Sequence, residues 1–390
     1  MLTLRARRFE TGEPVCVHIE GERISRVEPT WPSAEIENWP WVAPGFFDVQ
    51  INGHSGIWFS DGNLTVEQAL RAVHALLAHG ITQVLPTLIT NAQEALLHAL
   101  NVLRQACEVD DLARRMVAGF HLEGPYISAD DGPRGAHPRE HVRPADWKEF
   151  SQLQEAAGGR IRLVTLAPEV SGALDFIRRA VAAGVVVALG HTAAPPELIR
   201  AAVDAGARLS THLGNGSATF VHRHHNVFWE QLADTRLFIS LIVDGHHLPE
   251  AMVRTMLAAK TPRRIILTCD AAGWAGCPPG VYENNLGRSE ILVDGKLVVA
   301  GQRELLAGSA FETDWCVQRM RQITALPWRE IIPMTSKYPA QLLGTEYPKL
   351  RRGGLANLIV FSHDPQALRL NIQATILQGR TVFGSVPVLD

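Results

Sequence analysis

Eight apolar segments of strand length alternate with helical segments through the middle of this chain. Helical patterns such as 65–78, 92–106, 173–183 and 197–205 separate most of them. This alternation predicts a (β/α)8 barrel, a TIM-like α/β fold, because parallel strands are joined by helical crossovers and are buried on both faces. The predicted strands are 45–51, 81–88, 116–122, 161–166, 185–189, 207–211, 237–243 and 265–269.

The two ends of the chain carry strand patterns without helices. Alternating residues at 15–20 and 23–27 predict a hairpin, and segments 354–361 and 372–386 also indicate strands. We expect the two ends to pair into one small β-sandwich beside the barrel. The predicted division is 1–43 for the N-terminal part of the sandwich, 44–350 for the barrel and 351–390 for the C-terminal part.

The composition fits one large domain with a small appendage. The chain has 390 residues and is 46% hydrophobic, which is enough for an extensive core. Its formal net charge of −3 gives no basic surplus, so we expect neither nucleic acid nor a membrane surface as a partner. The five cysteines fit no disulfide framework or zinc ribbon, and no signal peptide or membrane-spanning run is evident. These features predict a cytoplasmic protein.

A polar residue stands at the carboxyl end of four predicted strands. They are Glu123, His191, His212 and Asp270. Barrel enzymes build their sites at this end, so we expect the four side chains to meet. Zinc binds carboxylate oxygen and imidazole nitrogen, and a catalytic zinc keeps one position open for water. A lone histidine is usually a hydrogen-bonded core residue, but three ligands at three strand ends favour a metal site.

Asp270 follows a fourth apolar run and completes this set. A carboxylate beside a metal site can accept a proton from activated water and pass it to a leaving amine. The alternative for Asp270 is a helix N-cap or a structural ion pair. We interpret it as the acid and base of a hydrolase.

Six short motifs occur in order along the barrel. They are His121-Leu122-Glu123-Gly124-Pro125, Gly135-Ala136-His137, Thr165-Leu166-Ala167-Pro168-Glu169, Gly190-His191-Thr192, Thr211-His212-Leu213 and Asp244-Gly245-His246-His247. In this order they resemble the N-acetylglucosamine-6-phosphate deacetylases of the amidohydrolase superfamily. Segments 44–53, 85–90, 338–340 and 354–358 match as well, so the resemblance covers nearly the whole chain.

The resemblance implies roles for the matching residues. Glu123, His191 and His212 correspond to the metal ligands, and Asp270 corresponds to the acid and base. His137 corresponds to a histidine near the substrate carbonyl, which it would bind and polarise.

Further residues correspond to the binding site for the sugar phosphate. His247 matches a histidine that contacts the substrate, and Asn215 with the backbone of Gly216 matches the phosphate-binding loop. Arg223 matches an arginine that reaches the phosphate across a dimer interface, and its guanidinium fork suits phosphate oxygens. A solvated loop arginine is the open alternative. The resemblance therefore implies a homodimer.

The first barrel strand bears on the number of metal ions. Many amidohydrolases place a His-x-His pair there and hold a second ion, whereas this chain has Gln50 and Asn52. Amide side chains are poor ligands for transition metals. The prediction is one divalent ion, with zinc expected and Fe, Co and Mn as alternatives that accept the same ligands.

The leading prediction is a metal-dependent amidohydrolase that cleaves a linear amide C–N bond of a small amino sugar. N-acetylglucosamine 6-phosphate and water would give glucosamine 6-phosphate and acetate. One alternative is a different N-acyl substrate, phosphorylated or not, because Trp274 and the sequence after His212 depart from the family pattern. Another is a non-catalytic relative. We expect the histidine-rich loop 221–226 at a surface or interface rather than at a second metal site.

Overall fold

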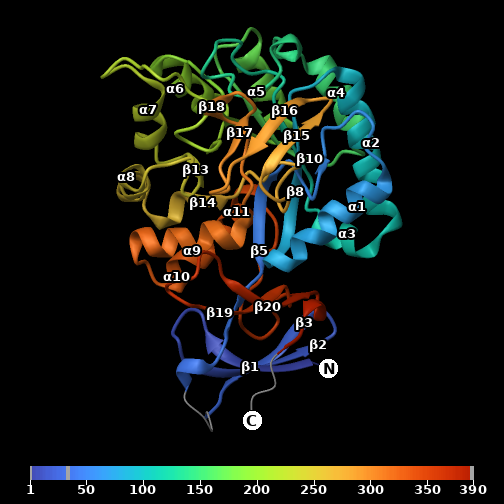
Figure 1. The fold of residues 1–390 in the computed structure, drawn as a ribbon, viewed down its shortest axis with the longest axis vertical. Coiled ribbons are helices and arrows are strands. Elements are labelled where there is room, and N and C mark those ends of the chain that lie inside the picture. The colour runs from blue at the N-terminus through green and yellow to red at the C-terminus, as the bar shows by residue number, and fades with distance from the viewer. Residues whose placement is uncertain (1, 32–35, 387–390) are drawn as a thin grey trace.

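An eight-stranded parallel sheet forms the centre of the computed structural model, which describes residues 2–31 and 36–386 (Figure 1). A parallel bridge between Ile51 and Ala271 brings its first and last strands together and closes a barrel. All eight predicted strands are confirmed. They are β5 (Phe46–Ile51), β8 (Ile81–Ile89), β9 (Phe120–Glu123), β10 (Ile161–Leu166), β11 (Val186–Leu189), β12 (Leu209–Ser210), β13 (Phe238–Ile242) and β14 (Ile265–Thr268).

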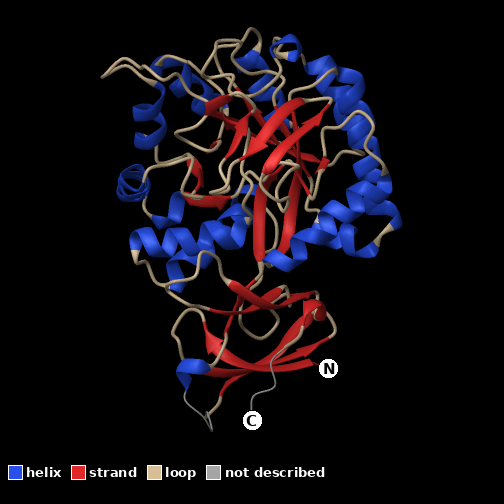
Figure 2. Cartoon of the chain, viewed as in Figure 1, coloured by secondary structure: helices blue, strands red, loops and turns tan. Residues whose placement is uncertain are grey.

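Helices surround the barrel strands (Figure 2). The first begins at Thr65, whose side chain accepts from the N–H of Gln68 in a capping box, and it buries Ala69, Ala72 and Val73. The α-helices are α1 (Val66–Ala75), α2 (Gln93–Val109), α3 (Asp111–Met116), α4 (Trp147–Ala156), α5 (Ala173–Ala182), α6 (Pro196–Ala205), α7 (Val227–Ala233), α8 (Glu250–Lys260), α9 (Thr313–Thr324), α10 (Trp328–Ile331) and α11 (Lys337–Leu343). Short 3-10 helices are η1 (Ile36–Asn38), η2 (Leu76–His79), η3 (Arg139–His141), η4 (Pro262–Arg264) and η5 (Ile332–Thr335).

Both chain ends contribute to one seven-stranded sheet, in the order β21-β20-β19-β4-β1-β2-β3. Neighbours are antiparallel except β1 and β4, and the sheet curls so that Arg23 bridges to Leu355 just before β19. The predicted pairing of the two ends is confirmed. The strands are β1 (Leu2–Arg8), β2 (Pro14–Glu20), β3 (Arg23–Pro29), β4 (Trp41–Pro44), β19 (Leu358–Ser362), β20 (Asn371–Leu377) and β21 (Arg380–Gly384). This sheet lies at the end of the barrel where β5 begins (Figure 1).

A four-stranded antiparallel sheet was not predicted. It comprises β15 (Gly280–Asn284), β16 (Gly287–Ile291), β17 (Leu297–Val299) and β18 (Gln302–Leu306). It lies above the carboxyl ends of the barrel strands (Figure 1). Trp274 anchors it by stacking on Tyr282 and meeting the edge of Trp58, which belongs to the small hairpin β6 (Gly53–His54) and β7 (Ile57–Trp58). Among the described helices, none combines the length and apolar character needed to cross a bilayer.

Candidate active site

A cavity of about 360 Å³ opens at the carboxyl ends of the barrel strands. Strand-end residues form its floor, and the loops around 132–137 and 214–219 form part of its wall. Residues 284–289 and 304–308 of the four-stranded sheet complete the wall. The cavity therefore brings together the predicted strand-end residues and a segment that the sequence did not link to them.

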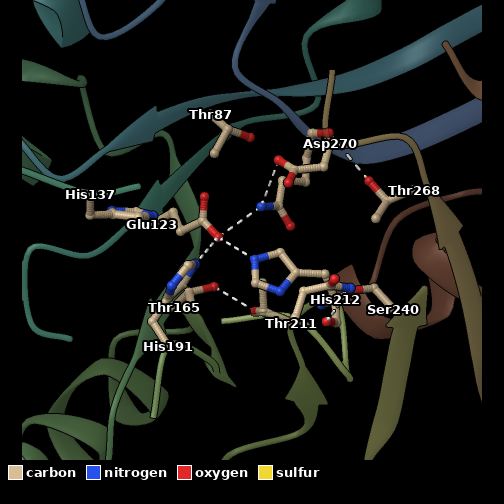
Figure 3. A network of polar contacts seen from close by, with 12 residues as sticks. Thr87, Glu123, His137, Thr165, His191, Thr211, His212, Ser240, Thr268 and Asp270 are labelled. Carbon is tan, nitrogen blue, oxygen red and sulfur yellow. Dashed lines mark hydrogen bonds and ion pairs between the residues drawn. The ribbon is translucent and has the colours of Figure 1, made fainter. Parts of the chain in front are cut away.

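Glu123 lies between His191 and His212 (Figure 3). Its Oε1 atom is 3.2 Å from Nε2 of His191 and 2.9 Å from Nε2 of His212, and all three side chains are buried. The three residues come from the ends of β9, β11 and β12, as the sequence predicted. Two imidazole nitrogens and one carboxylate oxygen thus converge at one place.

His191 is oriented in the way expected of a metal ligand. Its Nδ1 lies 2.9 Å from the carbonyl oxygen of Pro133, which can only accept, so Nδ1 carries the ring proton. In the neutral ring, Nε2 then directs a lone pair at the carboxylate oxygen of Glu123. Two facing lone pairs require a cation or a proton between them. Together with the backbone support at Nδ1, this arrangement fits a bound divalent ion.

The charges of the buried cluster favour the ionised carboxylate. Burial opposes ionisation of Glu123, but its close contacts with His191 and His212 outweigh burial and hold the pKa of Glu123 well below its usual value. Burial likewise opposes protonation of His212, and the hydrogen bond to Glu123 reverses this and raises the pKa of His212. The cluster therefore has an anionic oxygen that attracts positive charge.

Three of the strand-end residues adopt left-handed backbone conformations. The φ angles are 52° at His191, 28° at His212 and 52° at Asp270. Such a conformation costs a non-glycine residue about 1–3 kcal/mol and persists only where the surrounding structure enforces it. Here the barrel strands end abruptly and turn their last side chains into the cavity. Strain of this kind is concentrated at functional sites.

A polar chain inside the barrel supports the cluster. Nε2 of His121 lies 2.8 Å from Oγ1 of Thr165, which lies 2.7 Å from Oγ1 of Thr211. Burial lowers the pKa of His121 to about 4, so this ring is neutral at physiological pH. Figure 3 shows Thr165 and Thr211 beside the two histidines that follow β11 and β12.

Asp270 is buried and receives hydrogen bonds from two amide side chains. Its Oδ1 accepts from Nε2 of Gln50 at 3.0 Å and from Nδ2 of Asn52 at 2.7 Å. Gln50 also donates to Oε1 of Glu123 at 2.8 Å, so it bridges the two carboxylates. Burial raises the pKa of Asp270 to about 7, and the negative charge of Glu123 acts in the same direction. A carboxyl group with this pKa can both accept and release a proton near neutral pH.

His137 faces the cavity with a defined tautomer. Its Nδ1 lies 3.4 Å from the backbone N of Thr90, which can only donate, so Nδ1 is the acceptor and Nε2 carries the proton. The hydroxyl of Thr90 also contacts Nδ1 at 2.8 Å. Burial lowers the pKa of His137 to about 3, and the ring packs 4.3 Å from that of His191. A neutral N–H donor beside the cluster can bind a carbonyl oxygen.

The structure places three of the four further residues predicted to bind the sugar phosphate at the cavity, and the fourth, Arg223, elsewhere. His247 lines the cavity, and its Nδ1 contacts Oδ2 of Asp244 at 2.8 Å. Asn215 and Gly216 also line the cavity, and Nδ2 of Asn215 donates to the carbonyl oxygen of His212 at 3.2 Å. Arg223 does not line the cavity of its own chain, because it lies in an exposed loop.

Several residues of the site escaped the sequence analysis. The sequence indicated only that Gln50 and Asn52 are poor metal ligands. In the structure they donate hydrogen bonds to Glu123 and Asp270, and their position at the end of the first barrel strand could have indicated this. Trp58, Arg288 and Glu304 line the cavity without any motif that pointed to them. Nearby, His54 lies in the hairpin β6–β7, where its Nε2 contacts Oε1 of Glu312 at 3.1 Å.

Comparison with known proteins places the chain in a family. The model of the amidohydrolase family matches residues 41–382. The chain is 34% identical to N-acetylglucosamine-6-phosphate deacetylase of Bos taurus, over 88% of this chain and 83% of the relative. It is 33% identical to N-acetylgalactosamine-6-phosphate deacetylase of Escherichia coli O157:H7, over 97% of this chain and 98% of the relative.

Solved structures agree with these matches. The crystal structure of N-acetyl-D-glucosamine-6-phosphate deacetylase from Mycobacterium smegmatis superposes with a TM-score of 0.85 and 31% identity, covering 98% of this chain and 100% of that chain. The predicted resemblance is thereby confirmed, and with it the hydrolase class and its dependence on a metal. The chain therefore belongs to the amidohydrolase family and, within it, to the family of the N-acetylglucosamine-6-phosphate deacetylases.

Proposed function

We propose that this enzyme hydrolyses N-acetylglucosamine 6-phosphate to glucosamine 6-phosphate and acetate. The observation that carries the proposal is the convergence of Glu123, His191 and His212 beside a proton-accepting Asp270 and the donor His137 in one cavity. Relatives across animals and bacteria bear the name of this activity. A cavity of about 360 Å³ has the size expected for a small-molecule site.

Glu123, His191 and His212 are the proposed ligands of one divalent ion, and zinc is the proposed metal. When bound, such an ion supplies Lewis acidity to a carbonyl oxygen and lowers the pKa of nearby water. The amide side chains of Gln50 and Asn52 support a single ion, since both are engaged with carboxylates. Metal analysis of the purified protein would distinguish zinc from Fe, Co and Mn.

Asp270 and His137 are the proposed catalytic residues. Asp270 takes a proton from the attacking water as oxygen bonds to the acetyl carbon, and it returns this proton to the amide nitrogen as the C–N bond breaks. His137 donates its Nε2 proton in a hydrogen bond to the carbonyl oxygen, where negative charge develops. We expect Asp270→Asn to lower kcat by about 100-fold or more while metal content stays unchanged. A near-normal rate at full metal load would contradict the role of Asp270.

His247, Asn215 and the backbone of Gly216 are the proposed contacts to the sugar phosphate. All three residues line the same cavity as His137. Asp244 orients His247 through Nδ1, which leaves Nε2 for the substrate. This arrangement supports recognition of a hydroxyl or phosphate oxygen.

A homodimer is also proposed, with Arg223 reaching the phosphate bound by the partner copy. The segment that carries Arg223 projects from the barrel (Figure 1). Phe220 is 92% exposed there, and Trp229 at the start of α7 is 53% exposed. Large exposed aromatic side chains of this kind are typical of an interface.

The division into 1–43, 44–350 and 351–390 remains a proposal as well. It is supported by β4, which ends at Pro44 in the chain-end sheet, and by β19, which begins at Leu358. A cytoplasmic location is proposed from the free state of all five cysteines.

The test is acetate release from a panel of N-acetyl sugars by the metal-loaded enzyme. The panel contains N-acetylglucosamine and N-acetylgalactosamine, each with and without a 6-phosphate. We expect the fastest turnover with N-acetylglucosamine 6-phosphate. Faster turnover of N-acetylgalactosamine 6-phosphate would instead indicate the activity for which the E. coli relative is named. Equal rates with and without the 6-phosphate would argue against a phosphate site.

A further inference from the structure

The charges around the cavity are unbalanced for an anionic substrate. Three carboxylates line it: Glu123 and Asp270 on the floor and Glu304 on β18. Among the described residues that line it, Arg288 is the single Arg or Lys. A divalent ion at Glu123 would offset part of this charge, and a sugar phosphate would add further negative charge, so a second cation in the pocket would stabilise the bound substrate.

Arg288 lies on β16, a strand that pairs with β15 on one side and β17 on the other. It is the second residue of β16, and its carbonyl oxygen accepts from the N–H of Ala300 at 2.9 Å. Its neighbours Gly287 and Ser289 also line the cavity. The four-stranded sheet that carries Arg288 is anchored by the stacked rings of Trp274 and Tyr282. β16 therefore places Arg288 at the wall of the cavity, with the residue exposed.

The guanidinium of Arg288 is available to a ligand. Its partner in the antiparallel ladder is Glu283, which does not line the cavity. Within the described part of the chain, no ion pair joins Arg288 to Glu283 or to Glu304, although many surface arginines are paired. Guanidinium groups bind phosphate oxygens through two parallel hydrogen bonds.

We propose that Arg288 binds the phosphate group of the substrate within its own chain and thereby selects phosphorylated over unphosphorylated amino sugars. This inference deepens the proposed function and rests on it. Asn215 and Gly216 belong to the loop wall of the same cavity, so Arg288 adds a charged contact from the sheet above. The phosphate site then contains a cation even before a second copy supplies Arg223.

The test compares Arg288→Gln with the matched control Arg303→Gln. Arg303 lies on the neighbouring strand β18 of the same sheet but does not line the cavity. Binding of glucosamine 6-phosphate and of glucosamine is measured by calorimetry on metal-loaded protein. We expect Arg288→Gln to weaken glucosamine 6-phosphate about 10- to 100-fold, as for loss of a charged hydrogen bond, and to leave glucosamine unchanged. Arg288→Lys should recover part of the affinity, and Arg303→Gln should bind as the wild type does.

Other outcomes overturn the inference. Unchanged affinity for glucosamine 6-phosphate in Arg288→Gln would show that the phosphate is bound elsewhere. Equal weakening of glucosamine and its phosphate would show a structural effect of the substitution. Acetate release by the wild type tests the proposed function separately: a chain that binds the phosphate through Arg288 but releases no acetate refutes the deacetylase and not the phosphate contact.

Discussion

Opposing interactions set the proton affinity of Asp270. Burial and the charge of Glu123 raise its pKa to about 7, whereas the hydrogen bond from Asn52 favours the carboxylate. Without such donors a buried carboxyl would stay protonated at neutral pH and could not act as a base. Asn52, the residue after β5, therefore lowers the proton affinity of Asp270.

We expect Asn52→Ala to raise the pKa of Asp270, because it removes a donor to the charged form. A base works only when ionised, so activity is present above its pKa and is lost as the pH falls through it. The acid limb of the kcat/KM profile should move to higher pH in this variant, with recovery at alkaline pH. Rates measured from about pH 5 to 9 would show the shift. The exposed Asn63→Ala is the control, and an acid limb that stays in place would count against the assignment.

Gly216 packs against a proposed metal ligand. A Cβ at this position would lie 2.8 Å from Nδ1 of His191, the atom that donates to Pro133. Gly184 also has a positive φ, but a Cβ there meets nothing within 4 Å. Alanine would strain the backbone at both positions, but only at Gly216 would it also push against the His191 ring. Comparing the two substitutions therefore distinguishes these effects.

We expect Gly216→Ala to displace the His191 ring and to weaken metal binding about 10- to 100-fold, as for other losses of ligand support. Gly184→Ala should cost only backbone strain, about 1 kcal/mol, with metal affinity unchanged. Metal titration and thermal unfolding of both variants provide the measurements. Equal metal affinities would mean that the site accommodates the extra methyl group.

At the scale of elements, the barrel was predictable and the four-stranded sheet was not. Strands such as β13 and β14 are buried at every residue, so they appear in the sequence as continuous apolar runs. β15 alternates half-buried and exposed residues and gives no such run. The proposed ligands were predictable because each follows an apolar strand. Arg288 was not, because only packing of the sheet over the barrel brings it to the cavity.

Trp274 links this sheet to the barrel. It is 8% exposed, stacks 4.9 Å from the ring of Tyr282 on β15, and meets the edge of Trp58, which lines the cavity. The indole that departs from the family pattern thus supports the cavity wall.

We expect Trp274→Ala to remove about 3–5 kcal/mol of packing free energy from this region. The four-stranded sheet should loosen, with a higher KM and faster proteolysis between residues 278 and 308. Limited proteolysis and steady-state kinetics would detect both changes. The 90% exposed Trp31 supplies the control variant Trp31→Ala. A protease-resistant Trp274→Ala enzyme with normal KM would show that other contacts hold the sheet.

At the scale of the whole molecule, the chain-end sheet and the cavity lie at opposite ends of the barrel. The chain-end sheet lies where the barrel strands begin (Figure 1). The cavity lies at their other end, among the residues that follow the strands. Every proposed ligand and proton-transfer group comes from one chain. The proposed dimer therefore adds substrate binding through Arg223 rather than completing the catalytic cluster.

Phe220→Asp tests the dimer. Placing a charge at a 92% exposed aromatic position should be harmless in a monomer but should destabilise an interface, because the charge would lose its hydration there. We expect the wild type to sediment as a dimer and Phe220→Asp as a monomer. The monomer should retain its metal and its kcat but show a higher KM for the phosphorylated substrate, since the partner's arginine is lost. Val293, which is 94% exposed on a turn of the four-stranded sheet, provides the control Val293→Asp. A monomeric wild type would remove the role of Arg223 in trans and leave Arg288 as the arginine at the phosphate.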